Sequence, residues 1–92
     1  MTVAVCEPLQ AMSSCLDSVR EMLLGLDDKA MTQILRDIET VSRKMQSVML
    51  DVVAEVDAQG IAAREGFGTT RRLLAAMLRL SSAEARSRVE QA

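Results

Sequence analysis

Arginine supplies the clearest candidate chemistry in this sequence. Residues 60–92 contain six arginines against three acids, a local charge of +3, whereas the whole chain carries −2. Guanidinium groups neutralise phosphates and hydrogen-bond to them, so a basic end on an acidic body is compatible with contact to nucleic acid. It is equally compatible with the two ends of the chain packing on each other.

Groups that commonly carry catalysis are scarce. The sequence has no His, and its two cysteines, Cys6 and Cys15, match no zinc-binding spacing. It contains no nucleophile elbow, no phosphate-binding loop and no dinucleotide fingerprint. We therefore expect no enzymatic activity, no metal and no cofactor. A disulfide between the cysteines is conceivable, but we expect both to be reduced and mostly buried.

The composition favours an all-α fold in a single small domain or fragment, residues 1–92. About half of the residues are apolar (49%), with one aromatic residue and one Pro, and the rest of the apolar set suits helices. No apolar run approaches the ~20 residues that span a bilayer, and the N-terminus lacks a basic leader, which indicates a cytoplasmic protein. Pro8 and Gly25 bound a predicted helix over 8–24. Its apolar stripe consists of Leu9, Met12, Leu16, Val19 and Leu23.

A long helix is predicted next, over 28–65, with Asp27 or Asp28 at its N-terminus. Its apolar residues alternate in steps of three and four, and Gly60 is either a weak point within it or a site of close packing. This stripe is longer than helix 8–24, so part of it needs another partner. Either the C-terminal helices fold back on it, or a second copy supplies a coiled-coil face and forms a homodimer. The stripe consists of Met31, Ile34, Ile38, Val41, Met45, Val48, Val52 and Val56.

The last third carries the clearest signals for helix ends. Gly66 followed by Phe67 predicts a Schellman turn, in which Phe67 packs back on the preceding helix. Thr69 is then the N-cap of a helix over 69–79, and Ser81 with Glu84 forms a capping box for a helix over 82–92. That last helix reaches the end of the sequence without a C-cap signal, so we expect the sequence to be cut within a longer architecture.

Helices 69–79 and 82–92 have the outline of a helix-turn-helix unit. Ala75 or Ala76 allows close crossing, Ala85 and Val89 face inward, and Arg79 stands in the turn where the motif commonly has Gly. In a DNA-binding interpretation the last helix enters the major groove of double-stranded DNA. In the structural alternative these are two packed helices with solvated arginines. The candidate residues are Ser82, Arg86 and Ser87 for base edges, and Arg71, Arg72 and Arg88 for phosphates.

An ordered set of short motifs adds a family resemblance. The segment 51–60 (DVVAEVDAQG) is followed by Gly66-Phe67-x-Thr69-Thr70, by Leu73-Leu74-Ala75, and by LRLSSAEAR-x-RV ending at Val89. Together these resemble the actinobacterial 13E12 repeat family, whose proteins carry the domain of unknown function numbered 222, often ahead of an HNH endonuclease domain. Residues from about 27 to 92 fit the N-terminal portion of that domain.

The resemblance implies an all-helical domain linked to DNA processing or mobile elements. Leu73 stands where Trp is common in the family, and the sequence contains no HNH motif, so nuclease activity does not follow. The sequence therefore predicts a non-catalytic module that binds or targets DNA. The alternative is a helical dimerisation or interaction fragment that does not bind nucleic acid, and no small-molecule substrate is evident for either.

Overall fold

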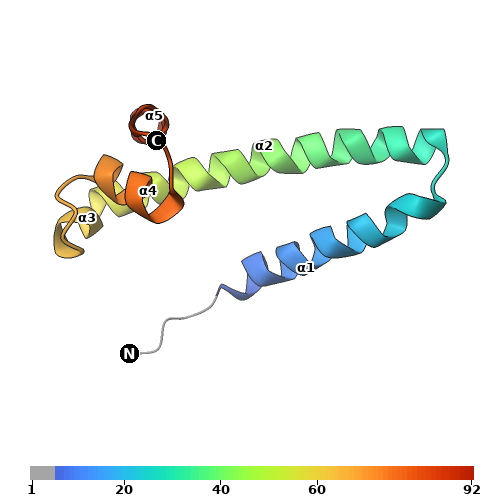
Figure 1. The fold of residues 1–92 in the computed structure, drawn as a ribbon, viewed down its shortest axis with the longest axis horizontal. Helices are drawn as coiled ribbons and strands as arrows, with labels where there is room; N and C mark the ends of the chain where they lie inside the picture. Colours follow the sequence, from blue (N-terminus) through green and yellow to red (C-terminus); the bar gives the residue numbers. More distant parts are fainter. Residues whose placement is uncertain (1–5) are drawn as a thin grey trace. The chain divides into compact units, whose positions relative to one another are not determined.

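A computed structural model describes residues 6–92 (Figure 1), and within them it contains helices and no strand, so the predicted all-α class is confirmed. The residues form two compact units, one ending at Ile38 and one spanning Glu39–Ala92, and α2 belongs to both. In chain order the elements are α1 Glu7–Met22, the short 3-10 helix η1 Leu23–Gly25, α2 Asp28–Ala58, α3 Ile61–Arg64, α4 Thr70–Leu78 and α5 Ser82–Gln91.

The first unit holds α1, η1 and the start of α2. Pro8 lies in the first turn of α1, as predicted, and the predicted helix 8–24 corresponds to α1 followed by η1. The Asp27 carboxylate accepts a hydrogen bond from the Ala30 N–H at 2.8 Å and so caps α2. None of the residues of α1 is buried.

The two cysteines differ from the prediction. Cys6 and Cys15 are both free and both exposed, so the expectation that they are mostly buried is wrong. Cys6 is the N-cap of α1 and Cys15 lies within it. Since α1 buries none of its residues, a cysteine on it has no core to enter, whatever its own hydrophobicity.

The predicted long helix over 28–65 is interrupted. In the structure α2 ends at Ala58, and Gly60 adopts φ 65°, in the left-handed region, before the single turn of α3. The Gly60 N–H donates to the Asp57 carbonyl oxygen at 3.1 Å, which closes the end of α2. Because Gly reaches positive φ without a Cβ clash, the helix stops here rather than continuing to residue 65. The weak point predicted at Gly60 is therefore a break.

The Schellman turn predicted after α3 is confirmed. The Phe67 N–H donates to the Ala62 carbonyl oxygen at 2.9 Å, and the Gly66 N–H donates to the Ala63 carbonyl oxygen at 3.2 Å. Gly66 has φ 84°, which a residue with a Cβ rarely adopts. This turn redirects the chain from α3 toward α4.

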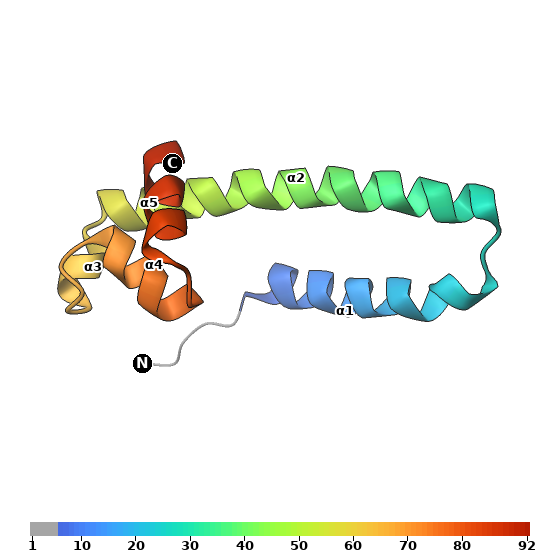
Figure 2. The same cartoon turned by 45° about the horizontal axis from the view of Figure 1, so that its top comes forward.

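The core of the second unit lies where α2, α4 and α5 meet. Figures 1 and 2 show α3, α4 and α5 gathered around the C-terminal part of α2. Val53 (1% exposed) of α2 packs in one cluster with Leu74 of α4 and Ala85 (0% exposed) of α5. Four half-buried apolar residues pack against this cluster: Met49, Ala75, Leu80 and Val89. Helix α2 therefore supplies the surface on which the C-terminal pair is built.

Two adjacent valines in α2 test this core. Val53→Ala removes two methyl groups from a fully buried site and should lower the free energy of unfolding by roughly 2 kcal/mol. Val52→Ala is the matched control, because Val52 has the same helical context but is 53% exposed. Its effect should stay within about 0.5 kcal/mol. Urea denaturation followed by circular dichroism measures both, and equal losses would contradict this placement of the core.

Candidate nucleic-acid interface

Helix α4 presents two arginines in its first turn. Thr69 is its N-cap, and the Thr69 Oγ1 accepts a hydrogen bond from the Arg72 N–H at 3.2 Å, as predicted. Arg71 and Arg72 are exposed, whereas the next two residues, Leu73 and Leu74, are buried. The cap and the buried leucines together fix the direction in which this turn faces.

The turn between α4 and α5 depends on Arg79. This residue has φ 54°, in the left-handed region, and is the one non-glycine with positive φ among residues 6–92. The Leu80 N–H donates to the Ala75 carbonyl oxygen at 3.2 Å, and Leu80 packs against the core cluster. Arg79 therefore adopts the conformation that Gly commonly supplies in a helix-turn-helix turn, at a cost that Gly would not incur.

Helix α5 begins as its capping signal predicts. The Ser81 Oγ accepts a hydrogen bond from the Glu84 N–H at 3.1 Å, and Ser82 is the exposed first residue of the helix. Ala85 is buried and Val89 packs against the core, which confirms the predicted inward pair. The exposed Arg86 follows Ala85 directly, so the core contact holds this part of α5 in place.

Arginines from both helices meet at one surface cavity of about 470 Å³. Arg71 of α4 and Arg86 of α5 both line it, together with the acidic residues Asp57 and Glu90. Asp57 also accepts a hydrogen bond from the buried Thr70 Oγ1 at 2.5 Å, which joins the end of α2 to the start of α4. The cavity therefore combines two cations with two acids.

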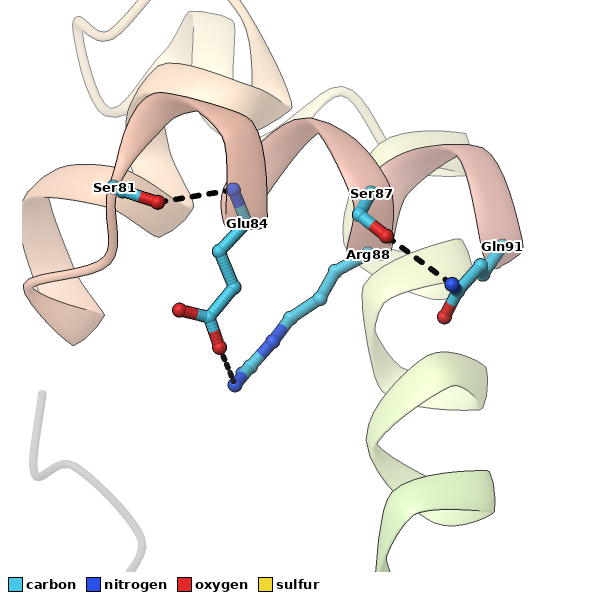
Figure 3. Close-up of polar contacts among 5 residues, drawn as sticks. All are labelled: Ser81, Glu84, Ser87, Arg88 and Gln91. Atoms are coloured by element: carbon cyan, nitrogen blue, oxygen red, sulfur yellow. Dashed lines mark hydrogen bonds and ion pairs between the residues drawn. The ribbon is translucent and has the colours of Figure 1, made fainter.

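The other two predicted contact residues are engaged within α5 (Figure 3). The Arg88 Nη2 lies 3.2 Å from the Glu84 Oε1, and the Arg88 side chain is 20% exposed. The Ser87 Oγ accepts a hydrogen bond from the Gln91 Nε2 at 3.1 Å. The six predicted residues thus divide into exposed members and members held by α5 itself. The exposed members are Arg71, Arg72, Ser82 and Arg86.

Sequence reasoning missed the acidic side of the cavity. Asp57 and Thr70 lie 13 residues apart, so no helical period links them, and their hydrogen bond follows from the break at Gly60. The sequence holds no local signal for this contact, because the burial of Thr70, which makes its hydroxyl need a partner, is seen only in the structure. Within residues 6–92, no group of three metal-ligating side chains is placed to hold an ion. No helix in that range is long and apolar enough to cross a membrane.

These features define an all-helical module with a capped helix pair and an arginine-bearing face. A family model described as a domain of unknown function (DUF222) matches residues 32–92, and the chain belongs to this family. The match begins five residues after the start expected from the resemblance. No curated protein and no solved structure matches the chain.

The strained turn gives a stability prediction. Arg79→Gly should raise the free energy of unfolding by roughly 0.5–1 kcal/mol, because Gly adopts positive φ without the clash of a Cβ. Ala76→Gly is the control, since Ala76 is exposed inside the same helix with ordinary helical geometry, and it should lower stability by about 1 kcal/mol. Thermal unfolding by circular dichroism measures both. A destabilised Arg79→Gly variant would show that the arginine side chain contributes more than its backbone costs.

Proposed function

We propose that this chain is a non-catalytic module of the 13E12 repeat type that contacts double-stranded DNA through α4 and α5. The observation that carries the proposal is the meeting of Arg71 and Arg86 at one surface cavity, beside the exposed Arg72 and Ser82. Arg71 of α4 can bind a backbone phosphate while Arg86 of α5 reaches a base edge, so contacts from two helices fix the position of the module on the duplex.

The placement of Arg71 and Arg72 also supports a ligand role. Both lie in the first turn of α4, where the helix dipole disfavours cations by roughly 0.3–1 kcal/mol each. No carboxylate within the described residues forms an ion pair with Arg71, Arg72 or Arg86. Helix stability therefore does not explain Arg71 and Arg72, whereas an anionic partner does.

In this proposal α5 is the helix that enters the major groove. Ser82 opens α5 and Arg86 lies one turn further, so both can reach base edges from the same helix. Arg88 would reach a phosphate only after leaving Glu84. The Ser87 Oγ accepts a hydrogen bond from Gln91, and its own O–H remains able to donate to a base edge. We therefore assign the main contacts to Arg71, Arg72, Ser82 and Arg86, and secondary ones to Ser87 and Arg88.

The module is proposed to position DNA rather than cut it. The sequence has no His, so it cannot supply the imidazole chemistry of an HNH endonuclease. The family resemblance places such modules ahead of HNH endonuclease domains, which would use the DNA held by this one. A cytoplasmic setting with reduced cysteines completes the proposal.

A binding titration tests this function. The chain should bind a duplex of about 20 base pairs at low salt, measured by fluorescence anisotropy, with affinity falling steeply as salt rises. The double variant Arg71→Gln/Arg86→Gln should weaken binding by at least tenfold. It should also reduce the slope of log K against log salt by about 1, because Arg71 is the phosphate contact of the pair and each phosphate contact contributes about 0.9 to that slope.

The control variant is Arg20→Gln/Lys29→Gln, which changes the net charge by the same two units but lies in the first compact unit. It should bind DNA nearly as well as the parent chain. Equal losses from the two variants would indicate a diffuse charge effect, and absence of binding to any duplex at low salt would refute the proposal.

The second candidate function is a helical dimerisation or interaction module that does not bind nucleic acid. The specific observation in its favour is the row of exposed apolar residues on α2, which a partner helix would cover. It predicts self-association in sedimentation experiments together with no shift of DNA anisotropy. A chain that binds DNA and stays monomeric would exclude this candidate.

A further inference from the structure

Helix α2 carries an uncovered apolar face. Its apolar residues recur in steps of three and four, which places them along one side of the helix. Six members of the stripe are exposed, with exposed fractions between 37% and 53%: Met31, Ile38, Val41, Met45, Val48 and Val52. The other two members of the stripe, Ile34 and Val56, are half-buried. An apolar row of this extent is a surface that a partner helix can cover.

We propose that a second copy of the chain covers this face, with the two α2 helices antiparallel and Ile38 opposite Val41 of the partner subunit. This inference rests on the self-association through α2 that was proposed above as the second candidate function. It adds the relative direction of the two helices and the register in which they pair. It does not require or exclude DNA binding, because the α2 face lies outside the arginines of α4 and α5.

The charges beside the apolar face favour the antiparallel direction. Asp37, Lys44 and Asp51 each come directly before a residue of the face and so line one edge of it at seven-residue spacing. In a parallel pair this edge meets the opposite edge of the partner, which carries Ser42 and Met49 and no charge. In an antiparallel pair the edge meets itself, so acidic and basic groups can face each other.

Charge complementarity then selects among the antiparallel registers. With Ile38 opposite the partner's Val41, Asp37 faces the partner's Lys44, and twofold symmetry repeats this pair. A shift by one heptad brings Lys44 against the partner's Lys44 and Asp37 against the partner's Asp51. Like charges at these positions are unfavourable. The proposed register therefore has two opposite-charge contacts, whereas the register shifted by one heptad has only like-charge contacts.

A shift by two heptads restores opposite charges but reduces the apolar contact. It places Ile38 against the partner's Glu55, and twofold symmetry repeats this pair. Two layers of the interface would therefore contain a carboxylate. In the proposed register each of the six layers is apolar on both sides. Its three distinct pairs, each present twice, are Met31 with Val48, Ile34 with Met45, and Ile38 with Val41.

The proposed register also avoids the part of α2 that is already in use. The paired segment, residues 31–48, spans roughly 26 Å at 1.5 Å per residue. It ends before Met49 and Val53, which pack in the core with α4 and α5. The interface and the intramolecular core thus occupy successive segments of one helix.

Charge reversal on α2 tests the direction and the register together. Asp37→Lys should weaken the dimer roughly tenfold, and Lys44→Asp should weaken it by a similar factor, because each turns two attractive contacts into repulsive ones. The double variant Asp37→Lys/Lys44→Asp should restore the parent affinity. Sedimentation equilibrium with a reducing agent measures the three variants, since the exposed Cys6 and Cys15 could otherwise cross-link copies.

The variants are well matched as probes. Neither position has a charged residue three or four places away on α2, so the changes leave the intrahelical ion pairs intact. Asp37→Lys also removes the exposed hydrogen bond that the Gln33 side chain donates to Asp37. The single variants shift the net charge in opposite directions, so a general charge effect would move their dimer affinities oppositely. Circular dichroism checks that helix content is unchanged.

Each other arrangement gives a different result, and each would overturn the proposal. Variants that all dimerise like the parent chain indicate a parallel pair, and a tighter dimer with Asp37→Lys indicates the register shifted by one heptad. Weaker dimerisation with Lys44→Asp alone indicates the register shifted by two heptads. A monomer at every concentration, with helices intact, indicates that the face is covered within the chain. DNA titration of the same variants separates failure here from failure of the DNA proposal.

Discussion

Contact among Val53, Leu74 and Ala85 is the constraint on which the second unit depends. These residues come from three helices and form the buried cluster that joins them. Within residues 6–92 the buried apolar side chains are few, namely Val53, Ala62, Leu73, Leu74 and Ala85. A core of this size leaves a small margin of stability, so each member carries a large share of it.

The packing of that core sets the geometry of the candidate interface. Arg71 and Arg72 precede the buried leucines of α4, and Arg86 follows the buried Ala85 of α5. Packing of the buried neighbours therefore fixes the backbone positions from which these arginine side chains extend. The Asp57–Thr70 hydrogen bond adds a polar tie between α2 and α4 at the edge of the same cavity.

Local signals predicted much of this structure. Thr69, Ser81 and Gly66 end or begin helices as expected, because each makes its hydrogen bonds with residues a few positions away. The inward pair Ala85 and Val89 also followed from helical spacing. Features that depend on distant residues were not predictable in this way. Three such features follow from tertiary packing, which no short window of sequence contains: the presence of Arg71 and Arg86 at one cavity, the partner of Thr70, and the exposure of both cysteines.

Ala85 has a further consequence for how such modules can diverge. Its side chain is 0% exposed, so a single methyl group acts as the spacer between α5 and its neighbours. Close-packed interiors do not absorb added volume, so a larger side chain at this position must displace α5 as a body. Arg86 would move with the helix. The volume of the side chain at position 85 thus sets where Arg86 lies. Natural variation at this buried position can therefore alter the candidate interface without changing a contact residue.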